Sequence, residues 1–358
     1  MTLSSLGWND AVAAQFQPFA DSDFQPARVA RAHKHACDVF TATGLRPAAC
    51  TGRMLHEAAT HAELPVVGDW VVVRPRPGEA RLDIHAVLPR RTKFSRRAAG
   101  ERDMEQVVAA NVDTVFLMSS LDDNYNLRRI ERYLLLAWES GAQPIVVLNK
   151  ADLHVDPVTA RSEVTAIAPG ASVVVLSALE GSGIAELSPW LQPGRTIALL
   201  GSSGVGKSTL INRLLGADIQ DTGNISEANF KGRHTTTRRE LFVTPSGALV
   251  IDTPGMREVQ FWQTETSAVD DTFTDVGAIA QNCRFHDCRH NGEPGCAVLA
   301  ALNSGELDTD RWHSFQKLQR EQAFAARKAD ASLERVARQS WKKLTAQGRE
   351  QSRAKRGE

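Results

Sequence analysis

The segment Gly201-Ser202-Ser203-Gly204-Val205-Gly206-Lys207-Ser208-Thr209 constrains the fold more than any other part of the chain. An apolar run precedes it and a helix-like run follows it, so the pattern G-x-x-x-x-G-K-S lies between a strand and a helix. The glycines turn backbone N–H groups inward, and the helix N-terminus adds positive potential, which together make a cradle for phosphates. Lys207 would reach the outer phosphates, and the Ser208 hydroxyl would bind Mg²⁺. An ordinary glycine-rich turn is the alternative.

The length and composition indicate a multidomain protein without a membrane segment. A chain of 358 residues predicts two or three domains. The formal net charge is zero, but residues 311–358 carry 13 Lys and Arg against 5 Asp and Glu. No apolar run approaches the roughly 18 residues of a membrane span, and the N-terminus lacks a signal-peptide pattern. We therefore expect a cytoplasmic protein with no membrane contact.

Short alternating apolar runs between residues 33 and 88, separated by Gly and Pro, predict a small β-barrel. An OB-fold, an SH3-like barrel and part of a sandwich all fit this pattern. Residues 1 to about 30 are weakly patterned, which favours a loosely attached arm. We place the arm and the barrel in a first domain at residues 1–108. The basic segment 90–97 is then either a solvated linker or an RNA contact.

The pattern changes at residue 109. Apolar runs at 113–119, 144–148 and 172–176 are typical of buried parallel strands, with helical spacing at 127–138 and near 184–191. This alternation predicts an α/β domain with a doubly wound parallel sheet at residues 109–265, and the phosphate loop follows one of its strands. Beyond the loop helix, residues 219–238 are polar, as expected of a mobile loop, and residues 240–251 predict a hairpin.

Two further motifs follow buried strands and indicate a guanine nucleotide. In Asn149-Lys150-Ala151-Asp152, the Asp152 carboxylate would accept both N–H groups of a guanine edge, a donor pair that adenine lacks. Asn149 would fix the loop, and Lys150 would lie over the ring. In Ser177-Ala178, a backbone N–H would meet the base oxygen. Turn chemistry explains each motif alone, but together they favour GTP and GDP as ligands.

The magnesium side of the site is predicted from two other segments. In Asp252-Thr253-Pro254-Gly255, Asp252 would hold Mg²⁺ through water, and the Gly255 N–H would meet the γ-phosphate. A hydroxyl in His234-Thr235-Thr236-Thr237 would complete the magnesium shell. Ras-like enzymes place a water-orienting Gln directly after this glycine, whereas here the residue is Met256. We therefore expect slow hydrolysis by the free enzyme.

The order of the motifs predicts a circular permutation. In Ras-like GTPases the phosphate loop comes first, whereas here the guanine motifs at 149–152 and 177–178 precede it. The cyclic order is unchanged, so the same sheet can form with its termini moved. The segment after Gly255 is then attached directly to the nucleotide-sensing switch.

Cys283, Cys288, His290 and Cys296 predict a zinc centre. Three thiolates and one imidazole make a closed tetrahedral set, which is typical of one structural Zn²⁺. His286 is an alternative ligand, and a set of unrelated reduced cysteines is the other interpretation. We place this zinc module, a helical segment at 308–343 and a basic C-terminal extension at residues 266–358.

A permuted GTPase between an N-terminal barrel and a Cys-Cys-His-Cys module resembles the RsgA (YjeQ) family of bacterial GTPases. The segments 67–71, 109–113 and 232–236 also carry this resemblance. It implies an OB-fold barrel, one structural Zn²⁺, and Mg²⁺ bound with GTP. It further implies GTP hydrolysis stimulated by the small ribosomal subunit, in late maturation of that subunit and with rRNA binding. We expect the protein to be a monomer.

The resemblance also implies roles for individual residues. Residues 201–209, 149–152 and 177–178 would bind GTP, and Thr236, rather than Thr235, would be the switch ligand of Mg²⁺. His234 would orient the attacking water, or else be a solvent-facing loop residue. For the function as a whole, one alternative is a GTP-switched RNA-binding module whose hydrolysis is incidental. The other is a GTPase acting on another RNA or on a membrane-bound partner.

Overall fold

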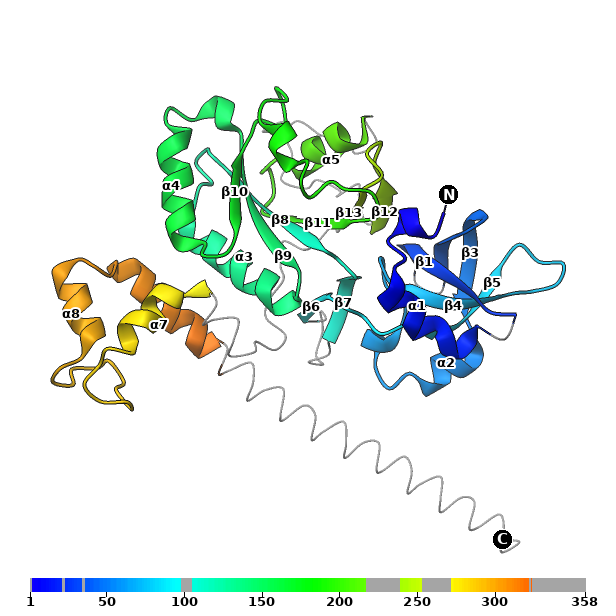
Figure 1. Cartoon of the computed structure of the whole chain (residues 1–358), viewed down its shortest axis with the longest axis horizontal. Helices are drawn as coiled ribbons and strands as arrows, with labels where there is room; N and C mark the ends of the chain where they lie inside the picture. Colours follow the sequence, from blue (N-terminus) through cyan, green and yellow to red (C-terminus); the bar gives the residue numbers. More distant parts are fainter. Residues whose placement is uncertain are drawn as a thin grey trace, which may run out of the picture.

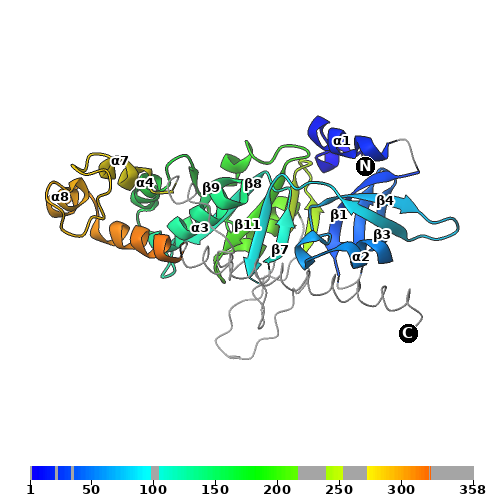
Figure 2. The same ribbon diagram turned by 90° about the horizontal axis from the view of Figure 1, so that it is seen from below.

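The computed structural model describes residues 2–20, 23–33, 36–97, 105–216, 239–252, 272–321 and 323. Figure 1 shows a β-barrel at one end, an α/β sheet in the middle and a small helical module at the other end. Figure 2, turned by 90°, shows the same linear arrangement, with α7 and α8 far from the barrel.

Five strands form the barrel, and their order is β1-β2-β3-β5-β4. Strand β4 also pairs with β1, which closes the barrel, and β3 and β5 are the one parallel pair in it. The helix α2 (Gly52–Glu57) connects β3 to β4. This connectivity confirms the OB-type barrel among the three options. The strands are β1 (Gln25–Ala32), β2 (Cys37–Thr41), β3 (Gly44–Cys50), β4 (Trp70–Pro75) and β5 (Leu82–Val87).

The expectation of a loosely attached N-terminal arm is wrong. The turn η1 (Ser4–Leu6), the helix α1 (Asp10–Phe16) and the turn η2 (Gln17–Phe19) pack on the barrel, and Leu6 is completely buried. The ring of Trp8 meets Trp70 edge-on, with 5.0 Å between centroids. These apolar residues show no period because they belong to single turns and one short helix. The packing that holds them is therefore not visible in the sequence pattern.

The central sheet has the strand order β10-β9-β8-β11-β13-β12, and β12 is antiparallel to its neighbour β13. Helices α3 (Leu127–Ser140) and α4 (Pro157–Ile167) cover one face, and α5 (Lys207–Leu215) covers the other (Figure 1). The doubly wound sheet is thus confirmed. Its strands are β8 (Thr114–Ser120), β9 (Gln143–Asn149), β10 (Ser172–Val175), β11 (Thr196–Gly201), β12 (Glu240–Val243) and β13 (Leu249–Asp252).

The predicted helix near 184–191 is instead a short 3-10 turn, η5 (Ile184–Leu187). It follows Gly183, which has a φ of 75° and lies so close to β10 that an added Cβ would be 2.4 Å from the Val175 oxygen. The chain therefore turns tightly at this glycine. Pro189 has no N–H to donate to the Ala185 oxygen, which keeps the turn from extending into a full helix.

The barrel and the central sheet are joined through hydrogen bonds as well as by the chain. Strand β1 pairs with β12 at Arg31 and Glu240, whose side chains also form an ion pair. A hairpin of β6 (Lys93–Arg97) and β7 (Glu105–Ala110) connects the two bodies in sequence. The two bodies therefore share one continuous sheet.

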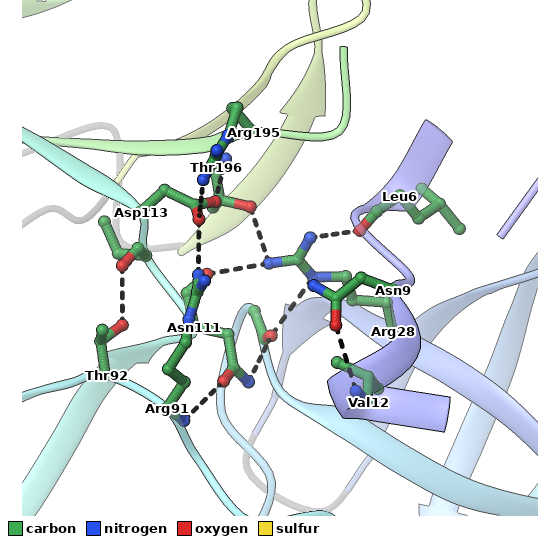
Figure 3. Close-up of polar contacts among 12 residues, drawn as sticks. Leu6, Asn9, Val12, Arg28, Arg91, Thr92, Asn111, Asp113, Arg195 and Thr196 are labelled. Carbon is green, nitrogen blue, oxygen red and sulfur yellow. Dashed lines mark hydrogen bonds and ion pairs between the residues drawn. The ribbon is translucent and has the colours of Figure 1, made fainter. Parts of the chain in front are cut away.

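Arg28 lies at the centre of this junction (Figure 3). Its side chain is buried and donates hydrogen bonds to the Leu6 oxygen, to the Gly68 oxygen at 3.3 Å, to the Asn111 oxygen at 3.1 Å and to Thr196 Oγ1 at 2.8 Å. These partners belong to the arm, the barrel, the connecting segment and the phosphate-loop strand. Burial lowers the pKa of Arg28 to about 10, so the group remains charged at neutral pH.

We expect Arg28→Lys to destabilise the protein by about 2–4 kcal/mol, since one ammonium cannot reach all four acceptors and leaves buried carbonyls unpaired. Urea unfolding followed by tryptophan fluorescence measures the change. Arg31→Lys is the matched control, because Arg31 is 38% exposed and its pair with Glu240 should contribute under about 1 kcal/mol. Equal unfolding midpoints for the two variants would contradict the assignment.

The C-terminal module packs on helix α3. It contains α7 (Thr274–Ala280), α8 (Ala297–Ser304) and a helix that begins at 309, near the predicted start, and is described as far as 321. Glu131 of α3 is completely buried and accepts hydrogen bonds from Arg311 Nη1 and Ser314 Oγ, each at 2.7 Å. Arg311 also pairs with Asp275 of α7. Within the described residues, no helix combines the length and apolarity needed to cross a membrane.

Candidate functional site

The phosphate-loop segment forms a glycine-lined turn between β11, which ends at Gly201, and α5, which begins at Lys207. Gly204 and Gly206 have φ values of 77° and 92°, which favour glycine. A Cβ on Gly206 would lie 2.2 Å from Asn149 Nδ2, so a side chain there would displace Asn149 from its hydrogen bonds. Lys207 Nζ donates to the Gly201 and Ser202 oxygens at 2.7 and 2.6 Å. The lysine therefore arches back over the start of the loop.

Asn149 ties the two guanine motifs to the phosphate loop. Its side chain is buried, its Nδ2 donates to the Val205 oxygen at 2.7 Å, and its Oδ1 accepts the Ala178 N–H at 2.9 Å. Segments separated by 29 and 56 residues are thus held by one amide. This arrangement fits the loop-fixing role expected of Asn149.

A cavity of about 250 Å³ lies where these loops meet. The lining residues come from both guanine motifs, from the phosphate loop and from the first turn of α5: Asn149, Lys150, Asp152, Leu153, Ser177, Ala178, Leu179, Gly204, Gly206 and Thr209. Asp152 supplies a carboxylate to it, while Leu153 and Leu179 are 64% and 71% exposed at its edge. One charged acceptor beside exposed apolar surface suits a flat, hydrogen-bonding base.

Asp122 is a residue of this site that the sequence patterns missed. It accepts a hydrogen bond from Lys150 Nζ at 2.7 Å and another from Ser120 Oγ at 2.7 Å. Burial raises the pKa of Asp122, but the hydrogen bonds from Lys150 and Ser120 outweigh it and lower the pKa to about 2. The carboxylate is therefore ionised and holds the Lys150 side chain. Its one sequence signal is its position just past β8, at the sheet edge that carries the other motifs.

The magnesium residues are placed only in part. Ser208 lies in the first turn of α5, and Asp252 is the last residue of β13. Because β11 and β13 are parallel neighbours, both residues are at the same edge of the sheet. Thr236, Gly255 and the proposed catalytic His234, together with Met256, lie outside the described residues.

The four predicted metal ligands converge. Their ligand atoms all lie within 4.8 Å of one another. His290 Nδ1 is 3.6 Å from Cys283 Sγ and 3.4 Å from Cys296 Sγ, and the two sulfurs are 4.0 Å apart. Tetrahedral zinc would separate such atoms by about 3.5–3.8 Å. The residues therefore fit a structural metal ion, and this ligand set contains His290 and not His286.

Comparisons with known proteins identify the family. The RsgA GTPase family model matches residues 87–262. An ABC transporter model matches residues 184–344, a range that includes the phosphate loop. The small ribosomal subunit biogenesis GTPase RsgA of Opitutus terrae is 62% identical over 352 residues, which cover 96% of each chain. The protein of the same name from Streptomyces coelicolor is 45% identical over 360 residues, covering 99% of this chain and 96% of that one.

One solved structure supports the same assignment, and a second supports the fold. YjeQ from Thermotoga maritima is 27% identical, with a TM-score of 0.62 over 84% of this chain and 99% of that one. YloQ, a circularly permuted GTPase, has a TM-score of 0.60 over 84% and 95% of the two chains at 23% identity, which supports the fold alone. The permuted fold expected from the motif order is confirmed, and this chain belongs to the RsgA GTPase family.

Proposed function

We propose that the protein hydrolyses GTP to GDP and phosphate when it is bound to the small ribosomal subunit, and that it acts in late maturation of that subunit with contact to rRNA. The observation that carries the proposal is the cavity shared by Asp152, Ala178 and the phosphate loop, with Asn149 bonded to both loops. The partner follows from the relatives, which are named small ribosomal subunit biogenesis GTPases. The protein would act in the cytoplasm as a monomer.

The site residues form three groups, which contact the base, the phosphates and Mg²⁺. The Asp152 carboxylate recognises guanine, and Asp122 holds Lys150 over the base. The Ser177-Ala178 segment lines the same cavity, and the Ala178 N–H holds its loop in place by donating to Asn149 Oδ1. The loop Gly201–Thr209 holds the phosphates, and Gly255 would contact the γ-phosphate. Ser208, Thr236 and Asp252 would hold Mg²⁺, which neutralises phosphate charge when it is bound. Zn²⁺ would be held by Cys283, Cys288, His290 and Cys296, with a structural role because all four positions are filled by protein.

Hydrolysis needs a water molecule that is oriented toward the γ-phosphate. Met256 offers no hydrogen bond for this purpose, so we assign the role to His234. Binding to the ribosomal subunit would place His234 beside the attacking water and so complete the site. This order of events makes hydrolysis dependent on the partner.

Single-turnover hydrolysis of GTP with and without purified small subunits tests the function. Strong stimulation supports the proposal. Salt-sensitive binding of the subunit without stimulation would instead indicate a GTP-switched RNA-binding module. The absence of both effects would indicate another RNA or a membrane-bound partner, and either of these results would overturn the proposal.

We expect His234→Ala to lower subunit-stimulated turnover by about 10²-fold or more, because positioning of the attacking group contributes effects of this size. The affinity for GDP should stay close to that of the wild type, since GDP has no γ-phosphate for the histidine to serve. Stopped-flow fluorescence with a labelled nucleotide and phosphate release measure the two quantities. Wild-type turnover in the variant would assign the water-orienting role to another group.

A further inference from the structure

Arg129, in the first turn of α3, contacts the phosphate loop at the end away from the guanine cavity. Its Nη1 donates to Ser202 Oγ at 3.2 Å and to the Asn124 oxygen at 3.4 Å. The backbone oxygen of Ser202 accepts the Lys207 ammonium at 2.6 Å, and Ser202 does not line the cavity. Two cations from different elements therefore converge on one loop residue. We propose that Arg129 is a catalytic residue that binds the outer phosphates of GTP beside Lys207.

The position of Arg129 in its helix is electrostatically unfavourable. The side chain of Asn126 caps α3 by accepting the Arg129 N–H at 2.9 Å, which places Arg129 near the positive end of the helix dipole. The positive charge of its neighbour Arg128 is compensated by ion pairs with Glu131 and Asp308. Among the side chains that the structure describes, no carboxylate pairs with Arg129. A half-buried cation with neutral partners in such a place is typical of a functional residue rather than a stabilising one.

The helix holds the Arg129 backbone still while its side chain is only weakly bound. Ile130 and Leu134 of α3 are buried in the core, and Glu131 is bonded to Arg311 of the C-terminal module. By contrast, the two hydrogen bonds of the guanidinium are long and end on neutral acceptors. An incoming phosphate offers charged acceptors, for which these two bonds would be exchanged.

The chemistry of the proposed function, on which this inference rests, calls for such a group. Water adds to the γ-phosphorus, the bond from that phosphorus to the bridging oxygen breaks, and GDP leaves with the electron pair. The proton lost by the water passes to the phosphate product. Charge spreads over the γ-phosphoryl oxygens in the transition state, and a guanidinium can bind two of them at once without changing its protonation. Arg129 would thus contribute from within the chain what other GTPases receive from an arginine finger.

The test compares Arg129→Ala and Arg129→Lys with the wild type. Arg132→Ala is the control, because Arg132 lies one turn further along α3 and pairs with Glu321 at 2.6 Å. We expect Arg129→Ala to lower single-turnover hydrolysis by about 10²-fold or more, with and without small subunits. The affinity for a non-hydrolysable GTP analogue should fall about 10-fold, while that for GDP changes less than about 3-fold. Arg129→Lys should recover part of the rate, and Arg132→Ala should match the wild type.

The outcomes separate the alternatives. Equal losses of GDP and GTP-analogue affinity in Arg129→Ala would show a structural role and overturn the inference, as would a wild-type hydrolysis rate. If the wild-type protein itself fails to hydrolyse GTP, the proposed function fails. In that case, the difference between the GDP and GTP-analogue affinities still decides whether Arg129 reaches the outer phosphates.

Discussion

Replacing Asp152 by Asn is expected to weaken GTP binding by about 10²-fold or more and to shift the preference of the protein to xanthosine triphosphate. Asp152 lines the cavity between the two guanine loops, where its carboxylate would accept both N–H groups of the guanine edge. The asparagine amide has a single acceptor oxygen, so it cannot accept both N–H groups of guanine. Its NH2 group would instead face one of these N–H donors. Xanthine carries an oxygen in place of the exocyclic amine, which restores the match. Competition with labelled GDP, using GTP, ATP and XTP as competitors, measures the shift.

Asp156→Asn is the matched control for this change. Asp156 lies four residues further along the chain and caps α4 by accepting the Thr159 N–H at 3.0 Å, a role that Asn performs equally well. We expect this variant to bind GTP as the wild type does. A protein in which Asp152→Asn keeps its preference for GTP over XTP would show that the base is read by other groups.

Removal of the metal is expected to unfold the C-terminal module while leaving GTP binding within a few-fold of the wild type. Binding of structural zinc contributes about 10–16 kcal/mol, which equals or exceeds the total stability of a typical domain. Cys296 has a second role, because its sulfur accepts the Leu299 N–H and caps α8. Cys296→Ser should therefore lose one equivalent of zinc, and limited proteolysis should then cut within residues 272–321.

Cys50→Ser serves as the control, because Cys50 lies in the barrel and should leave the zinc content at one equivalent. Elemental analysis of the purified variants gives the stoichiometry, and labelled GDP reports the nucleotide site. Retention of zinc by Cys296→Ser, or protease resistance of the metal-free module, would contradict the assignment of a structural zinc centre to Cys283, Cys288, His290 and Cys296.

The candidate nucleotide site could be predicted from the sequence because each of its motifs is local. A run such as Asn149–Asp152 or Gly201–Thr209 carries its own turn chemistry, and each follows a buried parallel strand. The carboxyl ends of such strands meet at one edge of a sheet, so the motifs had to converge once the cyclic strand order was recognised. The four metal ligands were equally visible, because all of them lie within 14 consecutive residues, 283–296.

The residues that the patterns missed act singly and over long separations. Arg28 meets Asn111 and Thr196 across 83 and 168 positions, and Arg129 meets Ser202 across 73. Asp122 likewise reaches Lys150 only because β8 and β9 are neighbours. Arg28, Asp122 and Arg129 belong to no motif, and the helical spacing around Arg129 indicates a helix but not what this side chain contacts. Their partners depend on strand register and on which helix face meets the loop.

The sequence by itself determined the permuted GTPase fold, the preference expected for guanine and the three cysteine ligands expected for zinc, because turn chemistry, motif spacing and apolar periodicity are properties of short segments. Only the tertiary structure decided that the barrel is an OB-fold, that the N-terminal segment packs on it through Leu6, and that Arg28 joins four parts of the chain. It also selected His290 over His286 as the fourth metal ligand. It also decided that Arg129 contacts the phosphate loop. Closure of the barrel, burial of Leu6 and the contacts of Arg28 and Arg129 depend on how the whole chain packs. A single side chain gains such partners only when distant segments come together.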